Sequence, residues 1–158
     1  MATEIERKFL VLADWPRPAA GTHLIQGYLS QSGPVSVRIR SSGERAWLTV
    51  KGPTSGLSRA EFEYEIPTAD AAEMLALSKT GPIEKTRYLV PHRGHVFEVD
   101  VFAGTNAGLI VAEVELAAED EAFDRPPWLG EEVSLDPRYR NSALCERPYS
   151  TWSSRPGP

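Results

Sequence analysis

The sequence predicts a mainly β fold with a few helices (α+β), in which eight antiparallel strands form a closed barrel around a tunnel. Charged residues recur at every second position in most segments, as in 4–6, 38–40 and 113–115. Turn signals such as 32–34 and 93–94 separate these segments by short gaps. Eight strands joined mostly by hairpins are enough to close a barrel.

Each predicted strand has one apolar and one charged face. Ile5 and Phe9 alternate with the acids of the first segment, and Val37 and Ile39 alternate with two arginines in the third. Side chains at i and i+2 share a face of a strand, so like charges gather on one side of each segment. The predicted strands are 3–12, 23–31, 35–41, 45–51, 59–66, 83–90, 95–102 and 109–116.

Two other segments are predicted to be helical. Residues 68–79 are rich in Ala and Leu, and a short element is expected around 141–146. Residues 118–123 are acidic and are expected to form a weaker helix or a turn, closed off by Pro126 and Pro127. The exposed apolar strand faces need covering, by these helices or by a partner subunit, which leaves a homodimer possible. We expect a single domain over residues 1–150 and a disordered tail over residues 151–158.

Composition limits the functions that the chain can have. With 41% hydrophobic and 25% charged residues, it is typical of a folded soluble protein. The net charge of −5 weighs against nucleic-acid partners. No apolar run is long enough to span a membrane and no secretory signal is evident, so we expect a cytoplasmic protein without membrane partners. A single cysteine, Cys145, and three histidines argue against a zinc site, so any metal must be bound by carboxylates.

The charged faces have two interpretations. For any one strand, a face of alternating charges is ordinarily solvated. The whole set is harder to explain this way, because acids are depleted in strands and like charges on one face repel each other. A divalent cation would neutralise the acids and a polyphosphate would neutralise the bases. The complete pattern therefore favours a binding site inside the barrel.

Residues 4–9, Glu-Ile-Glu-Arg-Lys-Phe, resemble the ExExK signature of the CYTH superfamily, the triphosphate tunnel metalloenzymes. The resemblance extends in order through most of the chain, over residues 26–29, 37–40, 48–52, 59–63, 85–87, 99–102 and 112–116. One short signature is weak evidence, but the ordered series is strong. The short chain and its opening are most similar to the small bacterial inorganic tripolyphosphatases.

The resemblance implies roles for individual residues. Candidate metal ligands are Glu4, Glu6, Glu61, Glu63, Asp100, Glu113 and Glu115. Of these, Glu61, Glu63 and Asp100 could instead hold basic groups. Candidate substrate-binding residues are Lys8, Arg38, Arg40, Lys51, Lys85 and Arg87. Candidate catalytic residues are Lys8, Tyr28, Glu63 and Lys85, although Tyr28 is equally well explained as a core aromatic.

The implied activity is hydrolysis of inorganic tripolyphosphate to pyrophosphate and orthophosphate, with Mg²⁺ or Mn²⁺ as cofactor and two ions expected. A nucleotide-processing enzyme remains an alternative, as a class IV adenylyl cyclase or a nucleoside or thiamine triphosphatase. A non-catalytic polyphosphate sensor built on the same tunnel is another. The presence of the acids at 4, 6, 113 and 115 disfavours the sensor.

Overall fold

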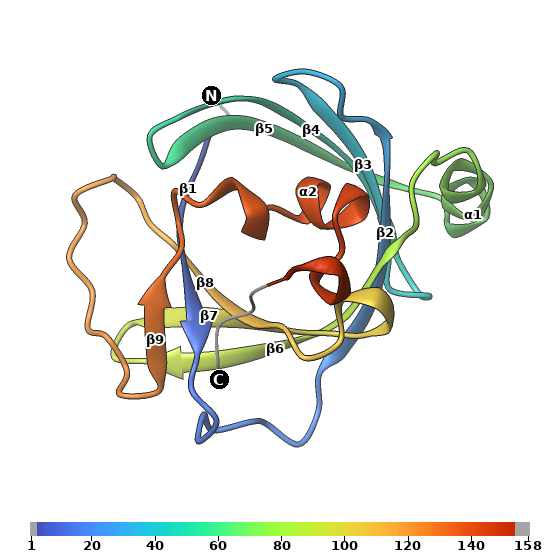
Figure 1. Cartoon of the computed structure of the whole chain (residues 1–158). Helices are drawn as coiled ribbons and strands as arrows, with labels where there is room; N and C mark the ends of the chain where they lie inside the picture. The colour runs from blue at the N-terminus through green and yellow to red at the C-terminus, as the bar shows by residue number, and fades with distance from the viewer. Residues whose placement is uncertain (1–2, 154–158) are drawn as a thin grey trace.

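The structure, a computed structural model, describes residues 3–153, and within them nine strands surround a short C-terminal helical segment (Figure 1). The strands are β1 (Thr3–Val11), β2 (Thr22–Ser30), β3 (Ser36–Ser41), β4 (Ala46–Ser55), β5 (Ser58–Ile66), β6 (Ile83–His92), β7 (His95–Phe102), β8 (Ile110–Glu115) and β9 (Leu129–Glu132). The α-helices are α1 (Thr68–Ala76) and α2 (Asn141–Glu146), and the 3-10 turns are η1 (Gly104–Asn106), η2 (Pro137–Tyr139) and η3 (Tyr149–Thr151).

Eight of the strands close the predicted antiparallel barrel. Their order is β5-β4-β3-β2-β6-β7-β8-β1, and pairing of β1 with β5 closes the ring. The closing contact is short, because Thr3 to Ile5 of β1 pair with Ala60 to Ser58 of β5. The mainly β, closed-barrel prediction is confirmed.

The ninth strand was not predicted. Beyond the closing contact, the later part of β1 leaves β5 and pairs with β9, with Phe9 opposite Glu132 and Val11 opposite Leu129. β1 thus has β8 along one edge and two successive partners along the other. Of the two forms expected for 118–123, a helix or a turn, the structure has the turn. This segment is irregular, because the Glu121 carboxylate accepts hydrogen bonds from the backbone N–H of Ala117 and from His95, which fold it into a turn.

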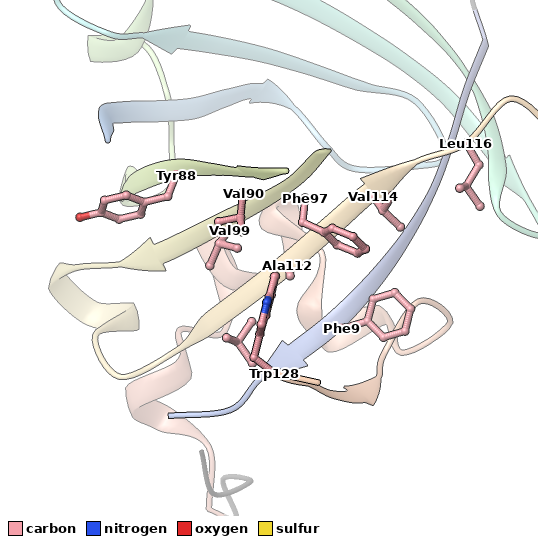
Figure 2. Close-up of a cluster of buried hydrophobic side chains, with 10 residues drawn as sticks. Phe9, Tyr88, Val90, Phe97, Val99, Ala112, Val114, Leu116 and Trp128 are labelled. Carbon is pink, nitrogen blue, oxygen red and sulfur yellow. The ribbon is translucent and has the colours of Figure 1, made fainter. Parts of the chain in front are cut away.

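The barrel carries its main apolar core on the outside of the wall formed by β6, β7, β8 and β1. Figure 2 shows Phe9, Val99, Ala112 and Trp128 among the side chains of this cluster. Partly buried residues from the loop after β1 and from the segment before β9 pack against it, including Trp15 and Phe123. The apolar strand faces on this side are therefore covered by the chain's own irregular segments.

Helix α1 covers the opposite wall, over β2, β3 and β4. Ala71 packs there with Ile39 and Ala46 in a second buried cluster. Gly27 permits this approach, because a Cβ at this position would lie 3.2 Å from Leu75 Cδ2. The helix predicted over 68–79 is present and ends at Ala76.

The segment after β9 turns back and fills one end of the barrel interior (Figure 1). Leu144 of α2 packs there against inward-facing residues of the wall, such as Ile83 of β6 and Phe102 of β7. The short helix expected around 141–146 is α2.

The predicted tail over 151–158 starts too early. Thr151 belongs to η3, and the ring of Trp152 stacks edge-on against Tyr139 and Tyr149 at centroid distances of 5.2 and 5.0 Å. Residues 154–158 lie outside the described residues. Among residues 3–153, no helix has the length and apolar character needed to cross a membrane.

Candidate active site in the barrel interior

A cavity of about 240 Å³ lies inside the barrel, and charged side chains dominate its lining. The alternation read from the sequence produces this lining, since the side chains on one face of each strand point inward. On β1, the inward side chains are Glu4, Glu6 and Lys8. Every predicted site residue except Asp100 lines the cavity. Within the described residues its charged lining is Glu4, Glu6, Lys8, Arg38, Arg40, Lys51, Arg59, Glu61, Glu63, Lys85, Arg87, Glu98, Glu113, Glu115 and Arg140.

The acids of β1 and β8 crowd together at one part of the cavity. Glu6 pairs across the ladder with Glu115, and its carboxyl lies close enough to Glu113 to form a hydrogen bond. Burial raises the pKa of Glu6 well above its ordinary value, and the neighbouring Glu113 and Glu4 raise it further. Without a cation, Glu6 therefore holds a proton in competition with its neighbours.

Lys51 contacts Glu4 of this group and Glu61 of β5. Its ammonium lies 3.0 Å from Glu4 Oε1 and 3.3 Å from Glu61 Oε2. Burial would raise the pKa of Glu4, but Lys51 and the hydrogen bond with Glu61 together lower it below the ordinary value. Burial and Glu4 raise the pKa of Glu61 to about 7. Of Glu4 and Glu61, Glu4 is therefore the ionised residue.

The bases of β6 are held by Asp100 beneath the cavity surface. Lys85 Nζ lies 2.8 Å from Asp100 Oδ2, and Arg87 donates to both oxygens of the same carboxylate at 2.8 and 2.9 Å. Burial would raise the pKa of Asp100, but Lys85 and Arg87 lower it below the ordinary value. These donors already occupy the carboxylate, so Asp100 orients two bases and is a poor candidate for a metal ligand.

Lys85 itself is fully buried. Burial lowers the pKa of Lys85 to about 7, and the neighbouring Asp100 opposes this shift. A lysine with such a pKa can both carry and release a proton near neutral pH.

Arg40 is a half-buried base of the cavity lining. Its side chain donates to the amide oxygen of Gln26 at 2.9 Å, and no carboxylate of the described residues forms an ion pair with it. Burial, together with Arg38 and Arg87, lowers the pKa of Arg40 to about 10. The basic part of the cavity thus holds more positive charge than its own acids neutralise.

Arg38 and Glu63 are linked through a buried hydroxyl. Arg38 Nη2 donates to Thr49 Oγ1 at 3.2 Å, and Thr49 donates in turn to Glu63 Oε2 at 2.9 Å. Arg38 Nε is buried and has no hydrogen-bond partner among the described residues. Glu63 therefore helps to fix Arg38 toward the cavity.

Tyr28 and Lys8 lie where the C-terminal segment meets the wall. Tyr28 lines the cavity and also packs in the apolar cluster around α2, so both interpretations of this residue describe part of its environment. Lys8 Nζ donates to the backbone carbonyl of Tyr139 at 3.0 Å and lies 3.5 Å from Glu113 Oε1.

Sequence reasoning assigned no role to several lining residues: Ser36, Thr54, Arg59, Ser134, Arg140, Asn141 and Ser142. Arg59 was detectable, because it precedes the Glu61 and Glu63 pair at the same period-two spacing. The residues after 133 had no such signal, since they reach the cavity only through the return of the C-terminal segment.

The acids of the cavity have the chemistry of ligands for a hard cation. The described residues contain no group of three or more His, Cys, Asp or Glu side chains already arranged to hold a metal ion. Carboxyl groups do meet in pairs, with hydrogen bonds between Glu6 and Glu113 and between Glu4 and Glu61. Oxygen donors that share protons in this way suit a hard divalent cation, which would take the place of the protons.

Known proteins resemble the chain over nearly its full length. It is 45% identical over 154 residues to an inorganic triphosphatase of Acetivibrio thermocellus, and the aligned region covers 96% of this chain and 99% of the relative. It is 42% identical to an inorganic triphosphatase of Nitrosomonas europaea, over 90% of this chain and 97% of the relative. A crystal structure of an inorganic triphosphatase superposes with a TM-score of 0.66 at 39% identity, over 92% of this chain and 95% of that one. The model of the CYTH domain matches residues 2–145, and the chain belongs to this family.

Proposed function

We propose that the protein hydrolyses inorganic tripolyphosphate to pyrophosphate and orthophosphate inside the barrel cavity. The observation that carries this proposal is the imbalance of charge within one enclosed site. Arg40 lines the cavity half-buried and forms no ion pair with an acid of the described residues, and Glu6 lies between two other acids. A polyanion bound with a divalent cation corrects both imbalances at once. The likeness to two inorganic triphosphatases supports the same substrate.

The bases bind the phosphate chain from several strands. Arg38, Arg40 and Arg87 present planar donors that suit phosphate oxygens, and Lys51 adds a compact charge. Lys8 and the Tyr28 hydroxyl orient the terminal phosphate from the end of the cavity that the C-terminal segment fills. Such positioning and charge stabilisation account for most of the catalysis in phosphoryl transfer.

Water attacks the terminal phosphorus, the bond to the bridging oxygen breaks, and pyrophosphate leaves. Lys85 has the protonation behaviour needed to give a proton to the leaving oxygen, because its pKa is about 7. Asp100 holds Lys85 in place, and Glu63 acts through Thr49 on Arg38.

Glu4, Glu6, Glu113 and Glu115 would hold one Mg²⁺ or Mn²⁺ ion, and Glu61 with Glu63 would hold a second. Bound ions of this kind neutralise phosphate charge and make a coordinated water more acidic.

Phosphate release from tripolyphosphate, ATP and thiamine triphosphate tests the proposal, with Mg²⁺, Mn²⁺ or EDTA in parallel. We expect fast release from tripolyphosphate that EDTA abolishes, and release from the other two at least about tenfold slower, a difference of about 1.4 kcal/mol in activation free energy. Equal release from ATP would replace the proposal with a general nucleotide hydrolase. Tight binding without release would support the sensor.

A further inference from the structure

A chain of buried hydrogen bonds joins two bases of the cavity through two neutral amides. Arg40 Nε donates to Gln26 Oε1 at 2.9 Å, and Gln26 Nε2 donates to Asn141 Oδ1 at 3.0 Å. Lys85 Nζ donates to the same Asn141 oxygen, also at 3.0 Å. Gln26 is fully buried, and Asn141 is the first residue of α2. The C-terminal segment is thereby tied to β2 and β6.

The chemistry of Arg40 fixes the orientation of both amides. Arginine donates hydrogen bonds and cannot accept them, so the Gln26 atom that faces Arg40 must be its oxygen. Gln26 must then present its NH₂ to Asn141, and the Asn141 oxygen accepts from two donors at once. The Asn141 NH₂ group must therefore point away from both Gln26 and Lys85.

The NH₂ group of Asn141 points toward the cavity. Asn141 lines the cavity together with Lys85 and Arg40, and its Nδ2 forms no hydrogen bond with any described residue. Because Nδ2 is not one of the buried side-chain atoms that lack a partner, it is accessible to solvent. An amide NH₂ beside two phosphate-binding cations is a hydrogen-bond donor of a kind that phosphate oxygens accept.

We propose that Asn141 binds the substrate directly, by donating from Nδ2 to a phosphate oxygen, while Lys85 and Gln26 hold its amide in the required orientation. The inference rests on the proposed function for the identity of the substrate. It assigns a substrate-binding role to a residue of the C-terminal segment and explains why a neutral amide occupies a site otherwise lined by charges. Because the amide does not titrate, its contribution is independent of pH.

Selective ¹⁵N labelling of asparagine tests the contact without any substitution. The chain has two asparagines, Asn106 and Asn141. Asn106 is buried and its oxygen accepts from the backbone N–H of Tyr149, so it is an internal control. Titration with tripolyphosphate, with Mg²⁺ and with EDTA, should move the side-chain NH₂ signals of Asn141 and leave those of Asn106 in place. Unmoved Asn141 signals in both conditions, for a protein that releases phosphate, would overturn the inference alone.

The variant Asn141→Asp separates substrate binding from a purely structural role. Aspartate keeps an oxygen toward Lys85 and Gln26, so a residue that only holds Lys85 would tolerate the change. A second oxygen replaces the NH₂ group and repels phosphate. We therefore expect kcat/KM for tripolyphosphate to fall by about 10–100-fold, mainly through KM, with an unchanged or higher Tm.

Glu146→Gln is the matched control. It replaces a carboxylate with an amide, the reverse of Asn141→Asp, on the same helix. Glu146 contacts Gln31, and neither residue lines the cavity. It should keep kcat/KM within about twofold, as expected for a surface change. Wild-type kinetics in Asn141→Asp would overturn the inference. Absence of both phosphate release and tripolyphosphate binding in the wild-type protein would instead overturn the proposed function. Should Asn141→Asp fail to fold, the labelled wild-type protein still decides the question.

Discussion

Glu6 and Asp100 show how two buried carboxyl groups of one barrel are given opposite properties. Asp100 is surrounded by Lys85 and Arg87, which keep it ionised in spite of burial. Glu6 has Glu113 and Glu4 as its strongest electrostatic neighbours, and both oppose its ionisation. The charge of Asp100 is neutralised by bases of the protein, whereas the charge of Glu6 would be neutralised only by a bound cation. This difference separates a supporting residue from a ligand.

Glu6→Gln should stabilise the metal-free protein and abolish its activity. The folded-state pKa of Glu6 lies above the unfolded value of about 4.3, so the folded state binds the proton more tightly. The cost of ionisation is absent below pH 4 and grows as pH rises toward the folded pKa, and glutamine removes it. Melting at pH 7 in EDTA should show a gain of about 2–4 °C for about 1 kcal/mol. An equal stabilisation of both proteins by Mn²⁺ would contradict the assignment of Glu6 as a ligand.

At the scale of elements, β1 connects the three parts of the wall that matter for the site. It carries Glu4, Glu6 and Lys8 into the cavity and pairs with β8, β5 and β9. Arg7, which faces outward between them, donates from Nε to Glu132 Oε2 at 2.8 Å and so fastens β9 to β1. Glu132 also accepts from Ser134, and Ser134 accepts from the backbone N–H of Lys8. These contacts of Arg7, Glu132 and Ser134, here called the clasp, lie next to the cavity, because Ser134 and Lys8 also line it.

Glu132→Gln should weaken the fold without changing the chemistry. Arg7 and Ser134 lower the pKa of Glu132 to about 2, below the unfolded value of about 4.3. The clasp therefore stabilises the protein fully above pH 5 and is lost as pH falls toward 2. We expect a loss of about 1–2 kcal/mol at pH 7, reduced by partial exposure, and a flatter stability profile between pH 5 and 2. Urea titrations of both proteins at pH 7 and pH 3 measure this, and an equal loss at both would contradict it.

The elements with a clear period were predictable, and those defined by their neighbours were not. Charge pairs at alternate positions marked six of the eight barrel strands, and period-two patterning between turn signals located β2 and β4. β9 consists of Leu-Gly-Glu-Glu, whose pattern has no apolar alternation, and it forms because Phe9 and Val11 offer it a free edge. Residues 118–123 have helix-forming composition, but the side chain of Glu121 is used in contacts to Ala117 and His95. In both places tertiary contacts outweighed local propensity.

For the whole molecule, charge is distributed unequally between inside and outside. Of the 22 acidic and 17 basic side chains, seven and eight line the cavity, which leaves fifteen acids and nine bases elsewhere in the chain. The inner surface attracts a small polyanion, while the remainder repels a long one. The period-two pattern made the wall of this site predictable, including Arg38, Arg40 and Lys85. Arg140 and Asn141 were not predictable, because the return of the chain into the barrel leaves no signal in the sequence.

Long polyanions should therefore fail to compete with small ones. Single-stranded DNA at micromolar phosphate concentration should leave tripolyphosphate hydrolysis unchanged at about 0.1 M salt, since the Debye length there is about 10 Å and the outer field is repulsive. Pyrophosphate at the same concentration of phosphate groups should inhibit competitively. Fluorescence anisotropy of labelled DNA with the protein gives the direct measurement. Tight DNA binding would mean that the basic groups form an outer surface after all.

The double use of β1 has a consequence for how the barrel folds. The strand that carries Glu4, Glu6 and Lys8 pairs with β8 and β9, which end at Glu115 and Glu132. Pairings between residues so far apart in the sequence, such as Glu6 with Glu115, form slowly because a long loop must close before any contact is gained. We therefore expect ring closure, and with it the assembly of the acidic cluster, to be a late step of folding.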